Sequence, residues 1–308
     1  MNQKNDKPKE HYVRKIEELR KKRNAVILAH VYQAGNVQDI ADFTGDSLEL
    51  SRKAVKTNAD VIVFCGVRFM AETAAILNPD KTVLLPNMDA GCELADMATV
   101  EVLRKMKEQH PDAAVISYVN SSAAIKAESD ACCTSANAVN IVNSIKQNQI
   151  LFLPDRNLGS YVAEITGRNV VRWDGYCYVH EDIELNTVNK LKLSHPGAIL
   201  IVHPECTKAV RDSAHYIGST SQMLAYVAKS DRKKFIVGTE DGFIHTLQKE
   251  NPDKKFYSVG AFCNGMKKIN LEKVATALEK MQFRIIVHEK TRVRAMKTLE
   301  KMLEYIPV

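Results

Sequence analysis

Short runs of β-branched and leucine residues alternate with longer helical patterns along the chain of 308 residues. In the first part the apolar runs are 25–29, 61–64 and 82–85, and the segments between them, 47–56 and 70–77, carry apolar residues at helical spacing. Buried strands that alternate with amphipathic helices are typical of a parallel sheet covered on both faces. The pattern therefore predicts an α/β fold.

The same order of helix and strand recurs twice more. The further expected elements are helices at 8–23, 99–109, 137–146, 159–166, 187–193, 221–228, 243–249, 271–281 and 291–305, and strands at 114–118, 150–153, 169–172, 198–202, 234–237 and 255–259. A stop of sequence Asn-Pro-Asp-Lys ends the middle helix of both the first and the third stretch, at Asn78 and Asn251.

Three cysteines end equivalent segments. Cys92, Cys177 and Cys263 follow strand and turn patterns, at separations of 85 and 86 residues. Equal spacing of this kind indicates an internal repeat. We therefore expect three pseudo-symmetric αβα domains, each with a small parallel sheet, around a central site. Their predicted bounds are 1–96, 97–182 and 183–269, and the remainder, 270–308, is expected to form a C-terminal helical segment that packs back on the first unit.

Other chemically active residues follow the same repeat. His30, Tyr118 and His203 each close a first strand, where ligands bind in open α/β sheets. A hydroxyl stands 17 residues after each of them, in the side chains of Ser47, Ser135 and Thr220. We expect the strand-end residues to face one cavity, accompanied by Tyr32, Asn120 and Glu205. Together they supply donors, a phenol and a carboxylate, which suit proton transfers on a small polar substrate.

The three hydroxyls fall at expected helix N-termini, with Asp46 or Ser47 as the cap of the first helix. Their first role is capping. Helix ends that face one cavity also form anion sites, so the expected ligand is small and polyanionic. No GxGxxG or P-loop spacing occurs in the sequence, and nucleotide binding is not indicated.

Composition narrows the class of protein. Hydrophobic residues make up 45% of the chain and charged residues 26%, which is ordinary for a soluble globular protein. The net charge of +6 is concentrated in Lys15–Arg23 and Lys290–Lys301, where helical spacing favours solvated faces over nucleic-acid binding. No apolar run approaches the ~20 residues of a membrane span, and the N-terminus lacks the apolar core of a signal peptide. We therefore expect a cytoplasmic protein with neither a nucleic-acid nor a membrane partner.

Seven cysteines in a reducing compartment are more often buried, catalytic or metal-bound than paired in disulfides. Three equivalent thiolates around a pseudo-threefold axis would form a facial metal site. A 4Fe-4S cluster held by three cysteines keeps one iron open to a substrate, and zinc with a fourth ligand is the competing metal. The cysteines outside the triple are expected to be inert core residues: Cys65, Cys132, Cys133 and Cys206.

These residues lie in motifs that resemble the quinolinate synthase family over nearly the whole chain. The motifs are AHVYQ at 29, GDSLELS at 45, GVRFMAET at 66, DAGCELADM at 89, YVNSSAAIKAESD at 118, CTSAN at 133, LPDRNLG at 153, WDGYCYVHE at 173, HPEC at 203, GSTSQM at 218, GTEDG at 238 and CNGMKKINLEKV at 263. Some members of the family carry extra cysteines near the third one, in a CxxCxxC arrangement. Here Asn264, Gly265, Met266 and Lys267 follow Cys263, so a thiol switch at that place is absent.

The resemblance implies condensation of iminosuccinate with dihydroxyacetone phosphate to quinolinate, phosphate and water in NAD biosynthesis. It implies that Cys92, Cys177 and Cys263 ligate a 4Fe-4S cluster, whose open iron acts as a Lewis acid. It also implies acid–base roles for Tyr32 and Glu205, with His203 as a further proton carrier. The substrate-binding positions that it implies are His30, Ser47, Tyr118, Val119, Asn120, Ser135, His203, Pro204, Glu205 and Thr220.

The implied partners are the two anionic substrates, with transient contact to the oxidase or dehydrogenase that produces iminosuccinate. Two alternatives remain at this point. One is another three-domain iron–sulfur enzyme with one cysteine per domain, of reductase or radical type. The other is a zinc-stabilised binding protein for small anions.

Overall fold

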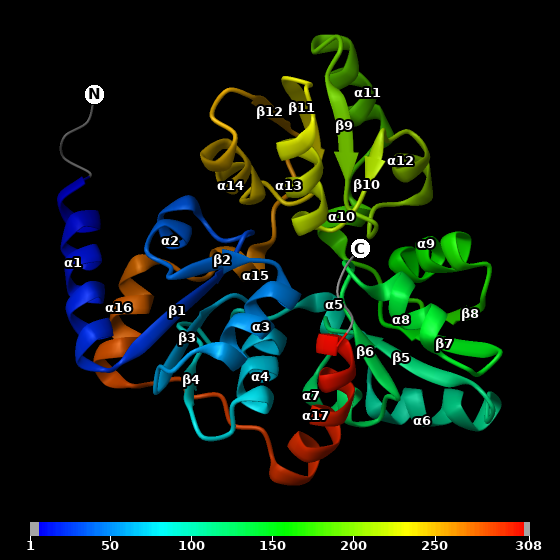
Figure 1. Ribbon diagram of the computed structural model, residues 1–308, viewed down its shortest axis with the longest axis horizontal. Helices are drawn as coiled ribbons and strands as arrows, with labels where there is room; N and C mark the ends of the chain where they lie inside the picture. The colour runs from blue at the N-terminus through cyan, green and yellow to red at the C-terminus, as the bar shows by residue number, and fades with distance from the viewer. Residues whose placement is uncertain (1–5, 305–308) are drawn as a thin grey trace. The chain divides into compact units, whose positions relative to one another are not determined.

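The computed structural model describes residues 6–304 (Figure 1). Residues 1–5 and 305–308, which belong to the first and last predicted segments, lie outside the described residues. The described chain divides into two compact units. One comprises the residues up to Cys92 together with Asn264–His288, and the other comprises Glu93–Cys263 together with the residues from Glu289 onward.

The first unit contains one sheet and the helices around it. Its elements are α1 (Asp6–Lys22), β1 (Ala25–His30), α2 (Gly35–Asp39), β2 (Phe43–Gly45), α3 (Ser47–Lys56), β3 (Val61–Cys65), α4 (Arg68–Leu77), β4 (Thr82–Leu84), α15 (Asn264–Lys267) and α16 (Leu271–Lys280).

The second unit contains two sheets. The elements of the first of them are α5 (Glu93–Asp96), α6 (Val100–Gln109), β5 (Ala114–Tyr118), α7 (Ala123–Ala127), β6 (Ala131–Cys133), α8 (Ala138–Ser144), β7 (Gln149–Leu153), α9 (Arg156–Thr166), β8 (Asn169–Arg172) and α17 (Glu289–Glu304). Those of the other are α10 (Tyr178–Glu181), α11 (Leu185–Ser194), β9 (Ile199–Val202), α12 (Lys208–Asp212), β10 (Tyr216–Ile217), α13 (Thr220–Lys229), β11 (Lys234–Gly238), α14 (Phe243–Glu250) and β12 (Lys255–Ser258).

The three sheets found in residues 6–304 share one topology. Their strand orders are β2-β1-β3-β4, β6-β5-β7-β8 and β10-β9-β11-β12, and every pair is parallel. Their central strands read as unbroken apolar runs because helices cover both faces. All five residues of β3 and of β5 are buried. The predicted α/β class with three small parallel sheets is confirmed.

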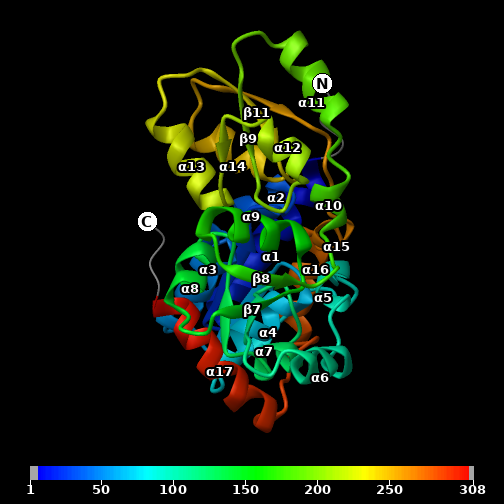
Figure 2. The ribbon, with the colours of Figure 1, turned by 90° about the vertical axis from the view of Figure 1, so that its right-hand side faces the viewer.

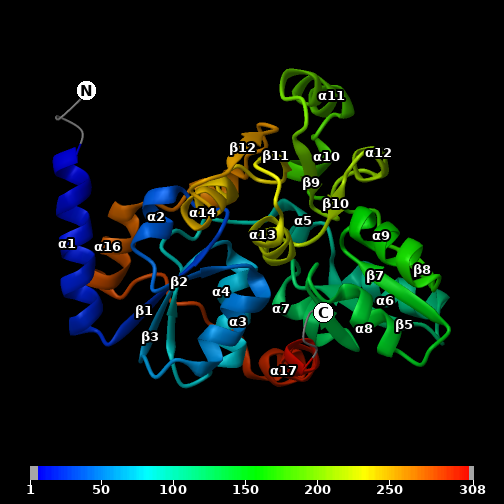
Figure 3. The same ribbon diagram turned by 45° about the horizontal axis from the view of Figure 1, so that its top comes forward.

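Helices cover both faces of the sheet in the first unit. α1 and α16 lie side by side on one face, and α3 and α4 pack together on the other (Figures 1 and 3). After α16 the chain runs antiparallel to β4, where Leu85 N–H donates to the Phe283 carbonyl at 3.1 Å and Ile285 N–H donates to the Val83 carbonyl at 2.9 Å. This segment covers backbone groups that an edge strand would otherwise leave exposed.

In the second unit, α17 packs on α7 and on β6. The Asn137 amide donates to the Met302 carbonyl at 2.9 Å, and the Thr298 hydroxyl donates to the Lys126 carbonyl at 3.3 Å. α16 packs on α1 in the first unit, whereas α17 has its partners in the second unit and buries Ala295, Leu299 and Met302.

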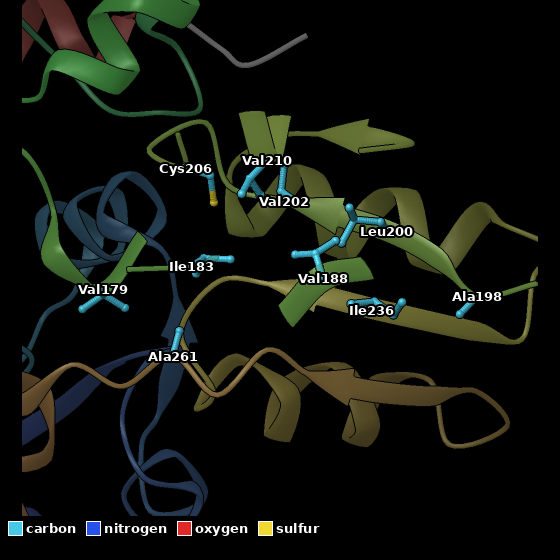
Figure 4. Close-up of a cluster of buried hydrophobic side chains, with 10 residues drawn as sticks. All are labelled: Val179, Ile183, Val188, Ala198, Leu200, Val202, Cys206, Val210, Ile236 and Ala261. Atoms are coloured by element: carbon cyan, nitrogen blue, oxygen red, sulfur yellow. The ribbon is translucent and has the colours of Figure 1, made fainter. Parts of the chain in front are cut away.

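The last sheet lies between two helix pairs, with α13 and α14 on one side and α11 and α12 on the other (Figure 2). Its core joins β9, β11 and α11, through Leu200, Ile236 and Val188, each fully buried. Figure 4 shows these side chains with Cys206 at the end of the cluster. Cys177 and Cys263 pack against the same cluster from partly buried positions.

One edge strand in each sheet escaped the sequence pattern. β2, β6 and β10 are two or three residues long, with the sequences FTG, ACC and YI. Runs this short cannot show a strand periodicity. One-turn helices were missed for the same reason: α2, α5, α7, α10, α12 and α15 have four or five residues each.

Leu200→Ala tests the contribution of this core. Because Leu200 is fully buried, the truncation should lower the free energy of unfolding by about 2–5 kcal/mol. Leu193→Ala is the matched control because Leu193, on α11 of the same sheet, is 81% exposed, and its effect should stay within about 0.5 kcal/mol. Denaturant unfolding of both variants measures the difference. Equal losses of unfolding free energy in the two variants would show that this cluster does not stabilise the unit.

Candidate functional site

His30 and His203 end the first strands of their sheets in the same local geometry. Both are buried, with 5% and 4% of their surface exposed. The Nδ1 atom of His30 accepts the Tyr32 N–H at 3.1 Å, and the Nδ1 atom of His203 accepts the Glu205 N–H at 3.3 Å. In each case the backbone N–H two residues beyond the end of the strand therefore fixes the orientation of the imidazole ring. The residue two positions later, Tyr32 or Glu205, is held by the same turn.

The caps of α3 and α13 are one residue earlier than the predicted hydroxyls. Asp46 caps α3 in a capping box with Glu49, and Ser219 caps α13 in a box with Gln222. The reciprocal bonds close at 3.0 Å from Asp46 N–H and at 2.9 Å from Ser219 N–H. Of the two caps considered for the first helix, Asp46 is the one used.

Ser47 and Thr220 are thus the first residues of their helices and do not perform the predicted capping. The second sheet has the matching turn, since Thr134 N–H donates to the Asn137 side chain at 2.7 Å and Ser135 follows directly. α8 begins only at Ala138, so Ser135 does not cap a helix either. Side chains one residue earlier cap α3 and α13, whereas α8 has no side-chain cap and the Ser135 hydroxyl contacts His203 instead.

A chain of side-chain contacts crosses the second unit from Ser135 to Thr239. His203 Nε2 lies 3.1 Å from Ser135 Oγ, and His203 Nδ1 lies 3.3 Å from the Glu205 Oε2 atom. The same Oε2 atom lies 2.8 Å from His180 Nδ1, and His180 Nε2 lies 2.8 Å from Thr239 Oγ1. The two imidazoles stack with centroids 4.6 Å apart. A hydroxyl, an imidazole and a carboxylate in series can move a proton.

Electrostatics favours an ionised Glu205. Burial alone would raise the pKa of its carboxyl, but the facing His180 and His203 outweigh burial and lower the pKa. Only 2% of the residue is exposed, and its Oε1 atom has no hydrogen-bond partner within residues 6–304. Nearby Asp155 shows the opposite shift, because burial and then the charge of Glu205 raise its pKa well above the usual value.

Two buried carboxylates hold the backbone of two predicted cluster cysteines. Asp155 accepts the Cys177 N–H at 3.1 Å, and Glu240 accepts the Cys263 N–H at 3.1 Å. Both acids are fully buried. Each follows the third strand of its sheet and pairs with the loop that delivers the cysteine, through the bridges Asp155 to Gly175 and Glu240 to Ala261. The equivalent residue in the first unit is the apolar Val67.

The Cys92 loop is fixed by close backbone packing within the first unit. Arg68 N–H donates to the Ala90 carbonyl at 2.8 Å, in the register that the other two loops also use. A Cβ atom on Gly265 would come within 2.2 Å of the Gly91 carbonyl oxygen. Only glycine permits this approach. Gly91 directly precedes Cys92 in the sequence, and Gly265 follows Cys263 by two positions.

The neighbourhood of Tyr32 is also built from residues that follow Cys263. Lys267 Nζ donates to the Tyr32 carbonyl at 2.6 Å, and the Gln33 amide contacts the Met266 sulfur at 3.4 Å. The Tyr32 ring meets the His30 ring edge-on with centroids 4.6 Å apart. α15 therefore positions Tyr32 and Gln33 within the first unit.

The remaining predicted binding residues lie in the second unit. Tyr118 is buried at the end of β5, and the Val119 N–H donates to the Cys133 carbonyl at 2.7 Å. Asn120 follows at a partly exposed position, and Thr220 is 3% exposed. A pocket of about 210 Å³ is lined by Ser135 and by Pro204, among others.

The seven cysteines, all within residues 6–304, are thiols and form no disulfide. The four outside the triple are fully buried, as expected, and are Cys65, Cys132, Cys133 and Cys206. Burial raises the pKa of the Cys65 thiol to about 12 and raises the pKa of the other three as well. Cys92, Cys177 and Cys263 are partly exposed. The predicted ligands are thus the accessible thiols.

Sequence reasoning found Ser135, His203, Glu205 and Cys177, which the structure brings into one cluster, but it missed His180, Thr239 and the two supporting acids. A signal for the acids existed, because Asp155 and Glu240 stand 85 residues apart, one of the separations between the cysteines. His180 lies one helical turn after Cys177.

No helix within residues 6–304 combines the length and the apolar composition needed to cross a membrane.

Comparison with known proteins identifies the family. The profile of the family described as "Quinolinate synthetase A protein" matches residues 14–304. Quinolinate synthase 1 of Methanosarcina acetivorans is 53% identical over 293 residues, which cover 94% of this chain and 96% of that protein. Quinolinate synthase of Desulforudis audaxviator is 54% identical over 294 residues, covering 94% and 97%. Quinolinate synthase of Geobacter metallireducens is 52% identical, covering 94% and 95%. The chain therefore belongs to the quinolinate synthase family and is an enzyme of this kind.

Proposed function

We propose that the chain condenses iminosuccinate with dihydroxyacetone phosphate to give quinolinate, inorganic phosphate and water, with a 4Fe-4S cluster on Cys92, Cys177 and Cys263. Membership of the family supports the reaction. The observation that carries the cluster assignment is the equivalence of the three cysteines. Each follows the fourth strand of a sheet of the same topology, and each is partly exposed while the other four cysteines are buried.

The donor set fits such a cluster. Fe–S clusters take thiolate ligands, and three thiolates leave one iron without a protein ligand. The backbone of the cysteine loops is held by Asp155 at Cys177, by Glu240 at Cys263 and by glycine packing beside Cys92. When bound, the cluster supplies a Lewis acid that polarises an oxygen of the substrate.

The residues of the chain handle protons around that centre. The Nδ1 atom of His203 accepts the Glu205 N–H, so the neutral ring carries its proton on Nε2 and can donate it to the Ser135 hydroxyl or to substrate bound there. Tyr32, held by its N–H bond to His30, is the second acid–base group. The reaction as proposed has no net redox change.

Substrate anions meet hydroxyls that are not used for capping. Ser47 and Thr220 are the first residues of ten-residue helices, and their N-termini favour negative charge. Ser135 stands at the matching turn of the second sheet. Three such positions suit the two carboxylates of iminosuccinate and the phosphate of its partner. Tyr118, Val119, Asn120, Pro204 and His30 complete the proposed binding set.

We further propose that the chain acts in the cytoplasm, in transient contact with the oxidase or dehydrogenase that forms iminosuccinate. Iminosuccinate has an imine that water hydrolyses, and a short transfer distance limits this loss.

Cys177→Ala should abolish the cluster and quinolinate formation together, because two thiolates cannot replace three. Iron and sulfide counting after anaerobic purification, with an assay free of added reductant, measures both. Cys65→Ala is the control: Cys65 is fully buried outside the triple, so its variant should keep iron, sulfide and turnover. A Cys177→Ala protein that turned over at the parental rate would refute the assignment.

Glu205→Gln should keep the cluster and lower kcat by about 10²- to 10⁴-fold, since the neutral amide lacks the charge that the carboxylate places beside His180 and His203 and cannot accept a proton. Steady-state kinetics on protein of matched iron content measures the effect. The control is Glu250→Gln, an exposed acid at the end of α14, which should change nothing. Unchanged turnover in Glu205→Gln would remove its acid–base role.

Ser47→Ala and Asp46→Ala separate binding from capping. Loss of the Asp46 cap should cost about 0.5–2 kcal/mol of stability. Loss of the Ser47 hydroxyl should leave stability unchanged and raise the KM of one substrate roughly 10- to 100-fold, because a hydrogen bond to a charged group is lost. Thermal unfolding and kinetics on both variants test the pair. A Ser47→Ala protein with reduced stability and normal KM would reverse these roles.

A further inference from the structure

Cys177, His180 and Glu205 form a second constellation of metal donors. The Sγ, imidazole nitrogen and carboxylate oxygen of these residues all lie within 4.8 Å of one another. We propose that, when the cluster is absent, these three residues bind a single divalent transition metal of the zinc type. The site would hold one metal ion per chain, with a fourth position open to water or to a substrate carboxylate.

The spacing of the donors is close to that of tetrahedral coordination. His180 Nδ1 lies 3.3 Å from Cys177 Sγ and 2.8 Å from Glu205 Oε2. Zinc bond lengths place neighbouring donors of a tetrahedral site about 3.3–3.6 Å apart. The nitrogen–sulfur distance falls in this range, whereas the nitrogen–oxygen distance of 2.8 Å is shorter and must lengthen when an ion binds. Thiolate, imidazole and carboxylate are all common zinc ligands, whereas calcium and magnesium prefer oxygen ligands alone.

Local structure explains why the donors face one point. Cys177 is the N-cap of α10, and His180 is the third residue of that helix, so the two side chains lie one turn apart on the same side. Glu205 comes from a different segment, three residues after the end of β9. The Thr239 hydroxyl contacts His180 Nε2 at 2.8 Å, which turns Nδ1 toward the other two donors. Contacts of this kind orient histidines at metal sites.

Glu205 provides the independent sign of a ligand. The residue is 2% exposed, and its Oε1 atom has no hydrogen-bond partner within residues 6–304. A buried carboxylate oxygen without a partner costs free energy, and a bound cation removes that cost. Metal binding also replaces protons, since Cys177 binds as a thiolate and His180 Nδ1 must be unprotonated.

The mononuclear site shares one ligand with the cluster of the proposed function. A metal bound through Cys177 therefore excludes the cluster, and the two forms are alternatives in the same chain. Their ligand sets differ otherwise: the cluster requires Cys92 and Cys263, whereas the mononuclear site requires His180 and Glu205. This difference makes the two proposals separately testable.

The experiment titrates full-length protein, freed of iron by purification in air with a chelator, with Co²⁺ as a spectroscopic substitute for Zn²⁺. The expected result is one Co²⁺ per chain, with tetrahedral d–d absorption and a thiolate-to-cobalt charge-transfer band that Zn²⁺ abolishes. Binding without the charge-transfer band, or no binding at all, would overturn the proposal.

Variants identify the ligands. Cys177→Ala, His180→Gln and Glu205→Gln should each weaken Co²⁺ binding at least 10-fold, and Cys177→Ala should also remove the charge-transfer band. Cys92→Ala and Cys263→Ala should bind Co²⁺ as the parent does. Circular dichroism and the Tm of each variant check that it folds, and Glu205→Gln tests the site with the least change of shape.

Two outcomes separate the proposals. If Cys92→Ala or Cys263→Ala loses Co²⁺ as Cys177→Ala does, the ion is held by the three cysteines, and the mononuclear site is refuted. If Cys92→Ala binds Co²⁺ normally but also keeps a full complement of iron and sulfide after anaerobic purification, the mononuclear site stands and the cluster assignment fails.

Discussion

Backbone N–H groups beyond the carboxyl ends of parallel strands have no partner in the sheet, and this constraint organises the molecule. The chain satisfies them with side chains at the strand ends. His30 and His203 accept such donors on their imidazoles, Asp46 does so as a helix cap, and Asp155 and Glu240 do so as buried carboxylates. Groups that close these loops are also groups that can bind metals, anions or protons. Loop closure and chemistry therefore use the same side chains.

Three copies of one turn then allow three different chemistries. The position two residues after the strand-end residue holds a phenol in Tyr32, an amide in Asn120 and a carboxylate in Glu205. The backbone around it is nearly constant: the residue between donates to the neighbouring strand in Val31 and Val119, while Pro204 has no N–H to donate. A repeated scaffold can thus serve an asymmetric substrate without any change of topology.

Much of this arrangement was predictable because equal spacing between distant residues is visible in the sequence even where short elements show no local pattern. Equal separations located the three cysteines and the strand-end residues, and strong apolar runs located the central strands. Local pattern could not locate β2, β6 or β10, which have too few residues for a period.

The hydrogen-bond partners were also beyond sequence reasoning. Sequence assigned capping to the repeated hydroxyls, but Asp46 and Ser219 bind the helix ends more effectively from one position earlier, because their own N–H groups are satisfied in return. The contact between His180 and Glu205 joins residues 25 positions apart through tertiary structure alone. No local pattern in the sequence predicts such a pair.

The packing of α15 also limits how oxidation could affect this enzyme. Three and six positions after Cys263 the chain carries Met266 and Ile269, which are 3% and 1% exposed. Met266 already contacts the Gln33 amide, so both positions are committed to the interior. A thiol introduced at either position would therefore lie in the interior, and oxidative damage would fall on the partly exposed thiols of Cys92, Cys177 and Cys263.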